Sequence, residues 1–172
     1  SAASWPAMNR PSNRLILLGL VVILFASTPS GWKTWARRPE EGQGAVSLRI
    51  VGAALAWLGV PYRFGGHGRN GVDCSGFVGA VLESAYPGGP YPGRSSAYAG
   101  FGEEARGEIR PGDILLFGAG ARIAHVGIAL SADSFIHAAS EGPRTGVIIS
   151  SLDESSWRED LVSARRIKEG RE

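Results

Sequence analysis

The sequence of 172 residues contains only one cysteine, Cys74, and only three histidines. A single cysteine excludes a disulfide within the chain, so cysteine pairing gives no information about the redox compartment. It also excludes zinc sites built on paired Cys-x-x-Cys motifs. Most free cysteines are small buried hydrophobic residues, and a chemical role for Cys74 therefore has to be argued from the residues around it.

A hydrophobic run long enough to span a membrane is also missing. The apolar stretch from Leu15 to Ala26 has about a dozen residues, whereas a spanning helix needs roughly 20. Arg10 and Arg14 precede this stretch, and small polar residues with Pro29 follow it, as in a secretory signal. We therefore expect export from the cytoplasm. No A-x-A cleavage site is evident, so an uncleaved leader could hold the protein at the membrane.

Charge of one sign is not concentrated in the C-terminal part of the chain. Residues 1–44 hold five Lys and Arg against two Asp and Glu, and the remainder holds 13 against 14. A nucleic-acid-binding domain would carry a clustered basic face, so we expect no nucleic-acid partner. The basic leader could still be attracted weakly to anionic lipid. The glycine-rich loop Gly65–Gly71 lacks the Gly-Lys-Ser/Thr ending of a phosphate-binding loop, and we expect neither a metal nor a cofactor.

Cys74 is placed where a helix should begin. The stretch from Ser75 to Tyr86 carries its apolar residues on one helical stripe, and Asp73 with the glycines before it prevents an earlier start. Unpaired backbone N–H groups and the helix dipole at this end favour an anion. The position therefore predicts a thiol that ionises more readily than an ordinary cysteine and can attack a carbonyl carbon.

Two of the three histidines lie in apolar, strand-like runs joined by a short turn. His125 is in the first run and His137 in the second, and a loop of residues 131–133 would place His137 opposite Gly127. Both imidazoles would then point to the same face of the sheet, as a base and its orienting partner require. His67, in the glycine-rich loop, is expected to be structural.

The spacing of apolar residues and breakers predicts an α+β fold. We expect a first helix from Ala45 to Leu58 and a second over 75–86, with a weakly indicated helix starting near 94–96. Strands are expected at 113–118, 124–130, 134–139, 146–150 and 161–167, with a short helix near 153–158 before the last of them. The expected organisation is a leader (1–27, of which 1–7 precede Met8 and could be non-native), a linker (28–44), one domain (45–168) and a tail (169–172).

Several ordered motifs resemble those of the NlpC-type (NlpC/P60) cysteine peptidases, in particular the small Spr-like murein endopeptidases. They are Gly59-Val60-Pro61-Tyr62-Arg63-Phe64-Gly65-Gly66, Asp73-Cys74-Ser75-Gly76-Phe77, Arg110-Pro111-Gly112-Asp113, His125-Val126-Gly127-Ile128 and Phe135-Ile136-His137-Ala138. The resemblance extends to Trp157 near the C-terminus. It implies a papain-like domain in which N-terminal helices pack on an antiparallel sheet of about five strands.

The resemblance also implies roles for six residues. Cys74 would be the nucleophile, His125 the base and His137 the orienting residue. Tyr62 would lie near the thiol and assist the oxyanion, or be only a half-buried aromatic residue. Asp73 and Ser75 would shape the pocket for the substrate, or serve only as helix-capping residues.

The implied activity is hydrolysis of amide bonds in peptidoglycan stem peptides through a Cys-His-His triad and a thioester intermediate. We expect these stem peptides to be the partner, the protein to be a monomer, and its location to be periplasmic or cell-wall associated. Three alternatives stay open: a cell-wall amidase, a related acyltransferase, and a catalytically silent module that binds the cell wall.

Overall fold

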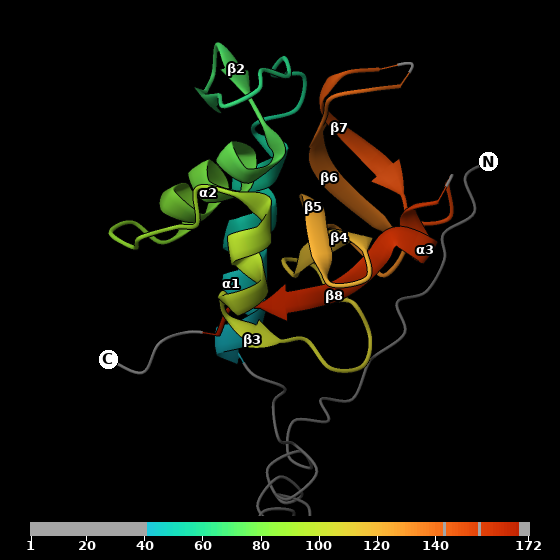
Figure 1. Cartoon of the computed structure of the whole chain (residues 1–172). Helices are drawn as coiled ribbons and strands as arrows, with labels where there is room; N and C mark the ends of the chain where they lie inside the picture. The colour runs from blue at the N-terminus through green and yellow to red at the C-terminus, as the bar shows by residue number, and fades with distance from the viewer. Residues whose placement is uncertain (1–40, 143, 155, 169–172) are drawn as a thin grey trace, which may run out of the picture. The chain divides into compact units, whose positions relative to one another are not determined.

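Two helices precede the main sheet in the computed structural model, which describes residues 41–142, 144–154 and 156–168 (Figure 1). The helix α1 spans Glu41–Leu55 and α2 spans Cys74–Ala85. The predicted leader, most of the predicted linker and the tail lie outside the described residues. The first helix starts at Glu41, four residues before the predicted domain boundary. The prediction missed its first turn because the residues of that turn show no apolar spacing.

A six-stranded antiparallel sheet forms the second half of the fold. Its strand order is β3-β8-β4-β5-β6-β7. The strands are β3 (Glu103–Glu104), β4 (Ile114–Ala119), β5 (Arg122–Ala129), β6 (Ser134–Ala139), β7 (Gly146–Ser151) and β8 (Leu161–Arg166). The five strands expected from the sequence are all present. The additional strand, β3, has only two residues and pairs with the end of β8, and it is too short to leave a pattern in the sequence.

The hairpin between β5 and β6 has the predicted register. Ile128 pairs with Ile136 and Ala129 with Phe135, and the N–H of Leu130 donates to the carbonyl of Ser134 at 2.8 Å. This register continues to Gly127 opposite His137. A Cβ atom added at Gly127 would lie 3.2 Å from the Cβ of His137, so the strands approach closely there.

The two faces of the sheet are covered by different apolar clusters. The first contains Ile114, Leu116, Val126, Ile128, Ile136 and Ala138 with the buried faces of α1 and α2. The second contains Leu115, Phe117, Ala129, Phe135 and Leu152, with Trp157 packed against it. Alternation along each strand sends neighbouring residues to opposite faces, which explains the division. Figure 1 shows α1 and α2 together on one side of the sheet and α3 on the other.

Asp113, directly before β4, and Arg166, at the end of β8, form a charged pair. Arg166 donates from its Nε to Oδ1 of Asp113 and from a terminal nitrogen to Oδ2, both at 2.7 Å. The side chain of Asp113 is 2% exposed and that of Arg166 is 14% exposed. Oδ2 of Asp113 also accepts from the N–H of Arg110, so the Arg-Pro-Gly-Asp motif is a turn that is tied to the last strand.

The remaining elements are short. The two-stranded sheet of β1 (His67–Gly68) and β2 (Gly71–Val72) precedes α2, and the 3-10 helix η2 (Ser95–Gly100) follows it. The helix α3 spans Trp157–Asp160, toward the C-terminal end of the expected segment. Within the described part of the chain, every helix is too short or too polar to cross a membrane.

Candidate active site

Asp73 fixes the start of the helix that carries Cys74. Its backbone is extended, and its Oδ1 accepts from the N–H of Gly76 at 2.7 Å, which is the geometry of an N-cap. Oδ2 accepts from the N–H of Gly65 at 3.0 Å, so the same carboxylate also ties the glycine-rich loop to the helix. The capping alternative for Asp73 is confirmed, and Cys74 is the first residue of α2, as predicted.

The half-buried thiol of Cys74 lies where α2 meets β5. The backbone N–H groups of Val126, Ser75 and Cys74 itself face the sulfur and lower its pKa. Burial opposes them and is the largest influence, and the negative charge of Asp73 adds to it, so the pKa of the thiol lies above its ordinary value of 9.0. The prediction of an unusually acidic thiol is therefore wrong, because loss of hydration outweighs the donors at the helix end.

His125 and His137 form a directly hydrogen-bonded pair. Nε2 of His125 lies 2.9 Å from Nδ1 of His137, and the two rings are nearly perpendicular, with an interplanar angle of 88°. His137 is 1% exposed, and His125 is half-buried. The prediction that the two imidazoles share one face of the sheet is confirmed.

Aromatic side chains of the second cluster surround this pair. The ring of Trp157 lies 5.5 Å from that of His125 and 5.0 Å from that of His137, centroid to centroid. Phe135 stacks on His137 at 4.8 Å, and Phe117 lies 6.1 Å from His125. These rings exclude water and disfavour a charged imidazole.

The resulting burial lowers the pKa of His125 from 6.5 to about 4. It lowers the pKa of His137 to about 3, and the neighbouring His125 adds to the effect. Both imidazoles are therefore neutral at pH 7. A neutral imidazole can accept a proton, which a general base must do.

The structure brings two of the three predicted residues into contact and places the third nearby. His125 and His137 are in contact, and Cys74 faces the N–H of Val126, the residue after His125. Among the described residues, no hydrogen bond joins the thiol to either imidazole. A neutral thiol and a neutral imidazole do not form an ion pair, which agrees with this arrangement.

Two tyrosines also lie close enough to Cys74 to interact with it electrostatically. The pKa of Tyr62 is raised by burial and then by the charges of Cys74 and Asp73. Tyr98, in η2, is fully buried, and its hydroxyl donates to the carbonyl of Ser75 at 3.3 Å. Its pKa is also raised, first by burial and then by Cys74. Sequence reading missed Tyr98 because the segment that carries it has no clear periodicity.

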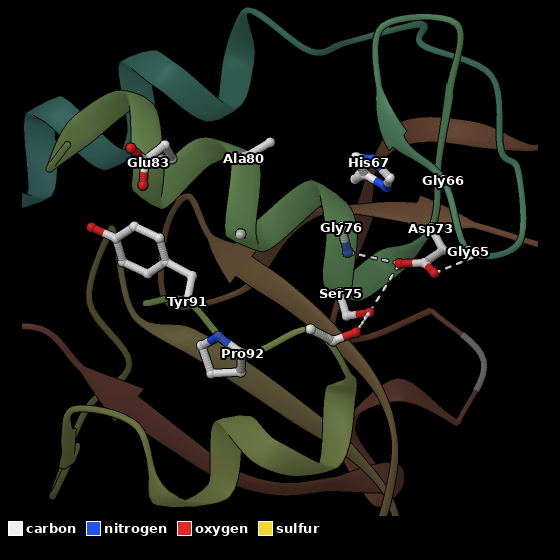
Figure 2. Close-up of a pocket in the computed structure, with 12 residues that line it drawn as sticks. Gly65, Gly66, His67, Asp73, Ser75, Gly76, Ala80, Glu83, Tyr91 and Pro92 are labelled. Carbon is white, nitrogen blue, oxygen red and sulfur yellow. Dashed lines mark hydrogen bonds between the residues drawn. The ribbon is translucent and has the colours of Figure 1, made fainter. Parts of the chain in front are cut away.

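A cleft of about 380 Å³ runs along the exposed side of α2 (Figure 2). Its floor is made by small residues at helical spacing, Gly76, Gly79 and Ala80, and its walls include Tyr91 and Pro92. Asp73, Ser75 and His67 also line it. The hydroxyl of Ser75 lies 2.9 Å from Oδ1 of Asp73 and 3.4 Å from the carbonyl oxygen of Gly93.

Sequence reading also missed Ser150, which lies behind the histidine pair. Its Oγ is 3.1 Å from Nε2 of His137. The register of β6 and β7 could have revealed it, since residues two apart on a strand share a face. In the described part of the chain, no group of three or more His, Cys, Asp or Glu side chains is arranged to hold a metal ion.

Comparison with known proteins adds independent information about this arrangement. Residues 59–166 match the model of the NlpC/P60 family. The chain is 37% identical over 123 residues to the Escherichia coli K12 protein named murein DD-endopeptidase MepS/murein LD-carboxypeptidase, covering 71% of this chain and 63% of that protein. It is 39% identical over 115 residues to the probable endopeptidase NlpC of the same strain, covering 65% of this chain and 72% of that protein.

The fold has a close match among solved structures. The crystal structure of the NlpC/p60 domain of the peptidoglycan hydrolase SagA matches with a TM-score of 0.60 and 28% identity. The match covers 70% of this chain and 98% of that domain. The chain therefore matches a whole domain of this kind, whereas it spans slightly less than two thirds of the MepS relative.

Proposed function

This chain belongs to the NlpC/P60 family, and from that membership we propose that it is a cysteine endopeptidase acting on peptidoglycan stem peptides. The relative named as a murein DD-endopeptidase supports the substrate class, and the relative named as a probable endopeptidase supports the reaction type. The observation that carries the proposal is the contact between His125 and His137 on β5 and β6, next to a cysteine that begins α2. An imidazole oriented by a second group, with a thiol facing the next residue of the same strand, supports nucleophilic catalysis.

In the proposed first step, Cys74 attacks the carbonyl carbon of the scissile amide while His125 takes the thiol proton. Since the pKa of the thiol is raised and that of His125 is lowered, the resting pair is neutral. Proton transfer therefore accompanies the attack and does not precede it. The new S–C bond gives a tetrahedral intermediate whose oxygen carries the negative charge.

Donors near the thiol would stabilise that oxygen. The backbone N–H groups that face the sulfur are fixed at the start of α2 and in β5, and fixed donors of this kind lower the barrier to acyl transfer. Tyr62 would supply a further O–H, since a phenol is protonated at neutral pH and the pKa of Tyr62 is raised further by burial.

Collapse of the intermediate breaks the C–N bond. The proton held by His125 passes to the departing amine, leaving a thioester on Cys74 and a neutral imidazole. His125 then takes a proton from water, which attacks the thioester, and the proton returns to the sulfur as the acid product leaves. Asp73 and Ser75 would shape the pocket from the loop side, and the cleft that they line is a candidate path for the peptide. The site of action would be outside the cytoplasm, where the murein named for the relative is located.

Incubation of the purified chain with peptidoglycan and with defined muropeptides tests this proposal. Wild-type protein should release cleaved stem peptides, and Cys74→Ala should release none while its circular dichroism spectrum is unchanged. Undiminished release by Cys74→Ala would contradict the assignment. Mass spectrometry separates the alternatives: a free lactyl group identifies an amidase, acyl transfer to a second nucleophile identifies a transferase, and binding without products identifies a silent module.

A further inference from the structure

Ser150 extends the histidine pair by one more hydrogen-bonding group. It lies on β7, where it pairs with Phe135 while Ile148 pairs with His137. Ser150 is two residues from Ile148 and so faces the same side of the sheet as His137. Its Oγ lies 3.1 Å from Nε2 of His137, and the serine is 8% exposed. Two consecutive hydrogen bonds therefore link His125 to His137 and His137 to Ser150.

The direction of the hydrogen bonds among His125, His137 and Ser150 decides whether His125 can act as a base. A neutral imidazole has one N–H donor and one acceptor nitrogen. If Nε2 of His125 carries the proton, it donates to Nδ1 of His137, and Nδ1 of His125 is left as an acceptor for a thiol proton. His137 must then carry its own proton on Nε2, where only an acceptor can satisfy it.

The opposite direction gives an inactive arrangement. A proton on Nδ1 of His137 would be donated to Nε2 of His125, and His125 would then carry its own proton on Nδ1. That nitrogen could no longer accept a proton from sulfur. The two arrangements contain the same number of protons. The hydroxyl of Ser150 can accept from Nε2–H in the first or donate to Nε2 in the second, whereas an apolar group there would leave a buried N–H without a partner only in the first.

We propose that Ser150 is a positioning residue that accepts a hydrogen bond from Nε2–H of His137 and so keeps His125 in the tautomer that can take the thiol proton. The inference rests on the proposed function for its catalytic consequence, although the tautomer itself does not depend on turnover. Without the hydroxyl, a buried N–H group of His137 would lose its partner, and such a loss is unfavourable. The proton would move to Nδ1 of His137, where His125 can accept it.

Four variants of the full chain test this proposal. Ser150→Ala removes the acceptor, and Ser150→Thr and Ser150→Val form a matched pair of nearly equal shape that differ in the hydroxyl. Ser151→Ala is the control, since Ser151 is adjacent on β7 and its Oγ contacts Asp153 and Asp133 rather than a histidine. We expect kcat on muropeptides to fall on the order of 10- to 100-fold for the alanine and valine variants with KM nearly unchanged. The threonine and Ser151 variants should keep wild-type kcat.

Nitrogen-15 NMR of histidine-labelled protein provides a readout that does not require activity. Only three histidines contribute, and a His67→Gln variant assigns the exposed one. Wild-type and Ser150→Thr protein should show His137 protonated on Nε2, and Ser150→Val should show the proton on Nδ1. If the alanine variant does not fold, the threonine and valine pair gives the same comparison.

Each outcome decides the proposal. Loss of kcat together with the tautomer change supports it. A Ser150→Val protein with wild-type kcat, or with the wild-type tautomer, overturns it. If the wild-type protein hydrolyses no muropeptide, the proposed function fails, and the NMR comparison alone still decides whether Ser150 sets the tautomer.

Discussion

The thiol of Cys74 faces the backbone N–H of Val126, the residue that follows His125 in β5. The start of α2 and the middle of β5 therefore meet at the point where the proposed nucleophile and the proposed base lie. Burial raises the pKa of the thiol, and this effect is larger than the lowering by the N–H group of Val126 and the other backbone donors. The structure thus favours a thiol that is activated during the reaction over one that is ionised at rest.

The raised pKa of Cys74 predicts slow alkylation near neutral pH. Only the thiolate reacts with iodoacetamide, so below the pKa the rate should increase about tenfold for each unit of pH. We expect this increase to continue above pH 9 in the folded protein. The rate of modification of Cys74, measured by mass spectrometry between pH 6 and pH 10, checks this expectation. The same chain unfolded in urea is the control, and its rate should level off at lower pH. A folded-state rate that levels off below pH 7 would instead indicate an ion pair with His125.

Burial of His137 predicts a loss of stability in mild acid. Its pKa is about 3 in the folded protein and 6.5 as an ordinary histidine, so the unfolded chain binds the proton more tightly. The stabilisation from keeping this ring neutral is complete above pH 6.5 and declines as the pH falls. At pH 5 the loss is about 2 kcal/mol.

Urea denaturation at pH 7.5 and pH 5 measures this effect. His137→Gln cannot bind the proton, and its free energy of unfolding should fall less between the two pH values than that of the wild type. An equal fall in both proteins would show that other groups cause the acid sensitivity.

Much of the fold could be predicted from the sequence because its elements follow simple periodicities. The strands that carry His125 and His137 are short apolar runs, and nearly all of β6 and the second half of β5 are continuously buried. A three-residue turn fixed their register. Elements without such a pattern were missed or only weakly indicated: β3 has two residues, and η2, expected to start near 94–96, has a single buried side chain, Tyr98. The first turn of α1 was missed for the same reason.

The candidate site was predicted less completely, because its electrostatics depend on packing between distant segments. Sequence position alone places Cys74 at a helix start, where the dipole favours a thiolate. The amount of water removed from the sulfur depends on how α2 meets β5, and no local pattern encodes that. Likewise, the aromatic cover over the histidines requires Trp157, which is 20 residues beyond His137 in the sequence.

Close packing of the glycine-rich loop on α2 predicts different effects for two glycines of the same helix. A Cβ atom at Gly76 would lie 2.2 Å from the carbonyl oxygen of Gly66, a distance that forces the loop to move. At Gly79 the nearest atom would be the hydroxyl oxygen of Tyr98 at 3.5 Å, which is ordinary contact. Gly76→Ala should therefore lower the free energy of unfolding by about 1–3 kcal/mol.

The matched variant Gly79→Ala should be neutral or stabilising by up to about 1 kcal/mol, because alanine favours the helix over glycine. Thermal and urea unfolding of the two variants check the difference. Equal free energies of unfolding would show that the loop at Gly66 moves without cost, and that its close approach to α2 does not affect stability.

The buried pair of Asp113 and Arg166 predicts a large effect from a small substitution. Asp113→Asn removes the charge and leaves the guanidinium of Arg166 in a largely buried position without its carboxylate. The loss of one partner from such a pair costs about 3–5 kcal/mol. The exposed pair of Glu103 and Lys168, whose side chains are 62% and 61% exposed, is the control, and Glu103→Gln should cost less than about 1 kcal/mol. Urea denaturation of both variants gives the comparison. Equal costs would show that burial does not strengthen the Asp113 pair, and the turn at Arg110 would then be held by its backbone hydrogen bonds alone.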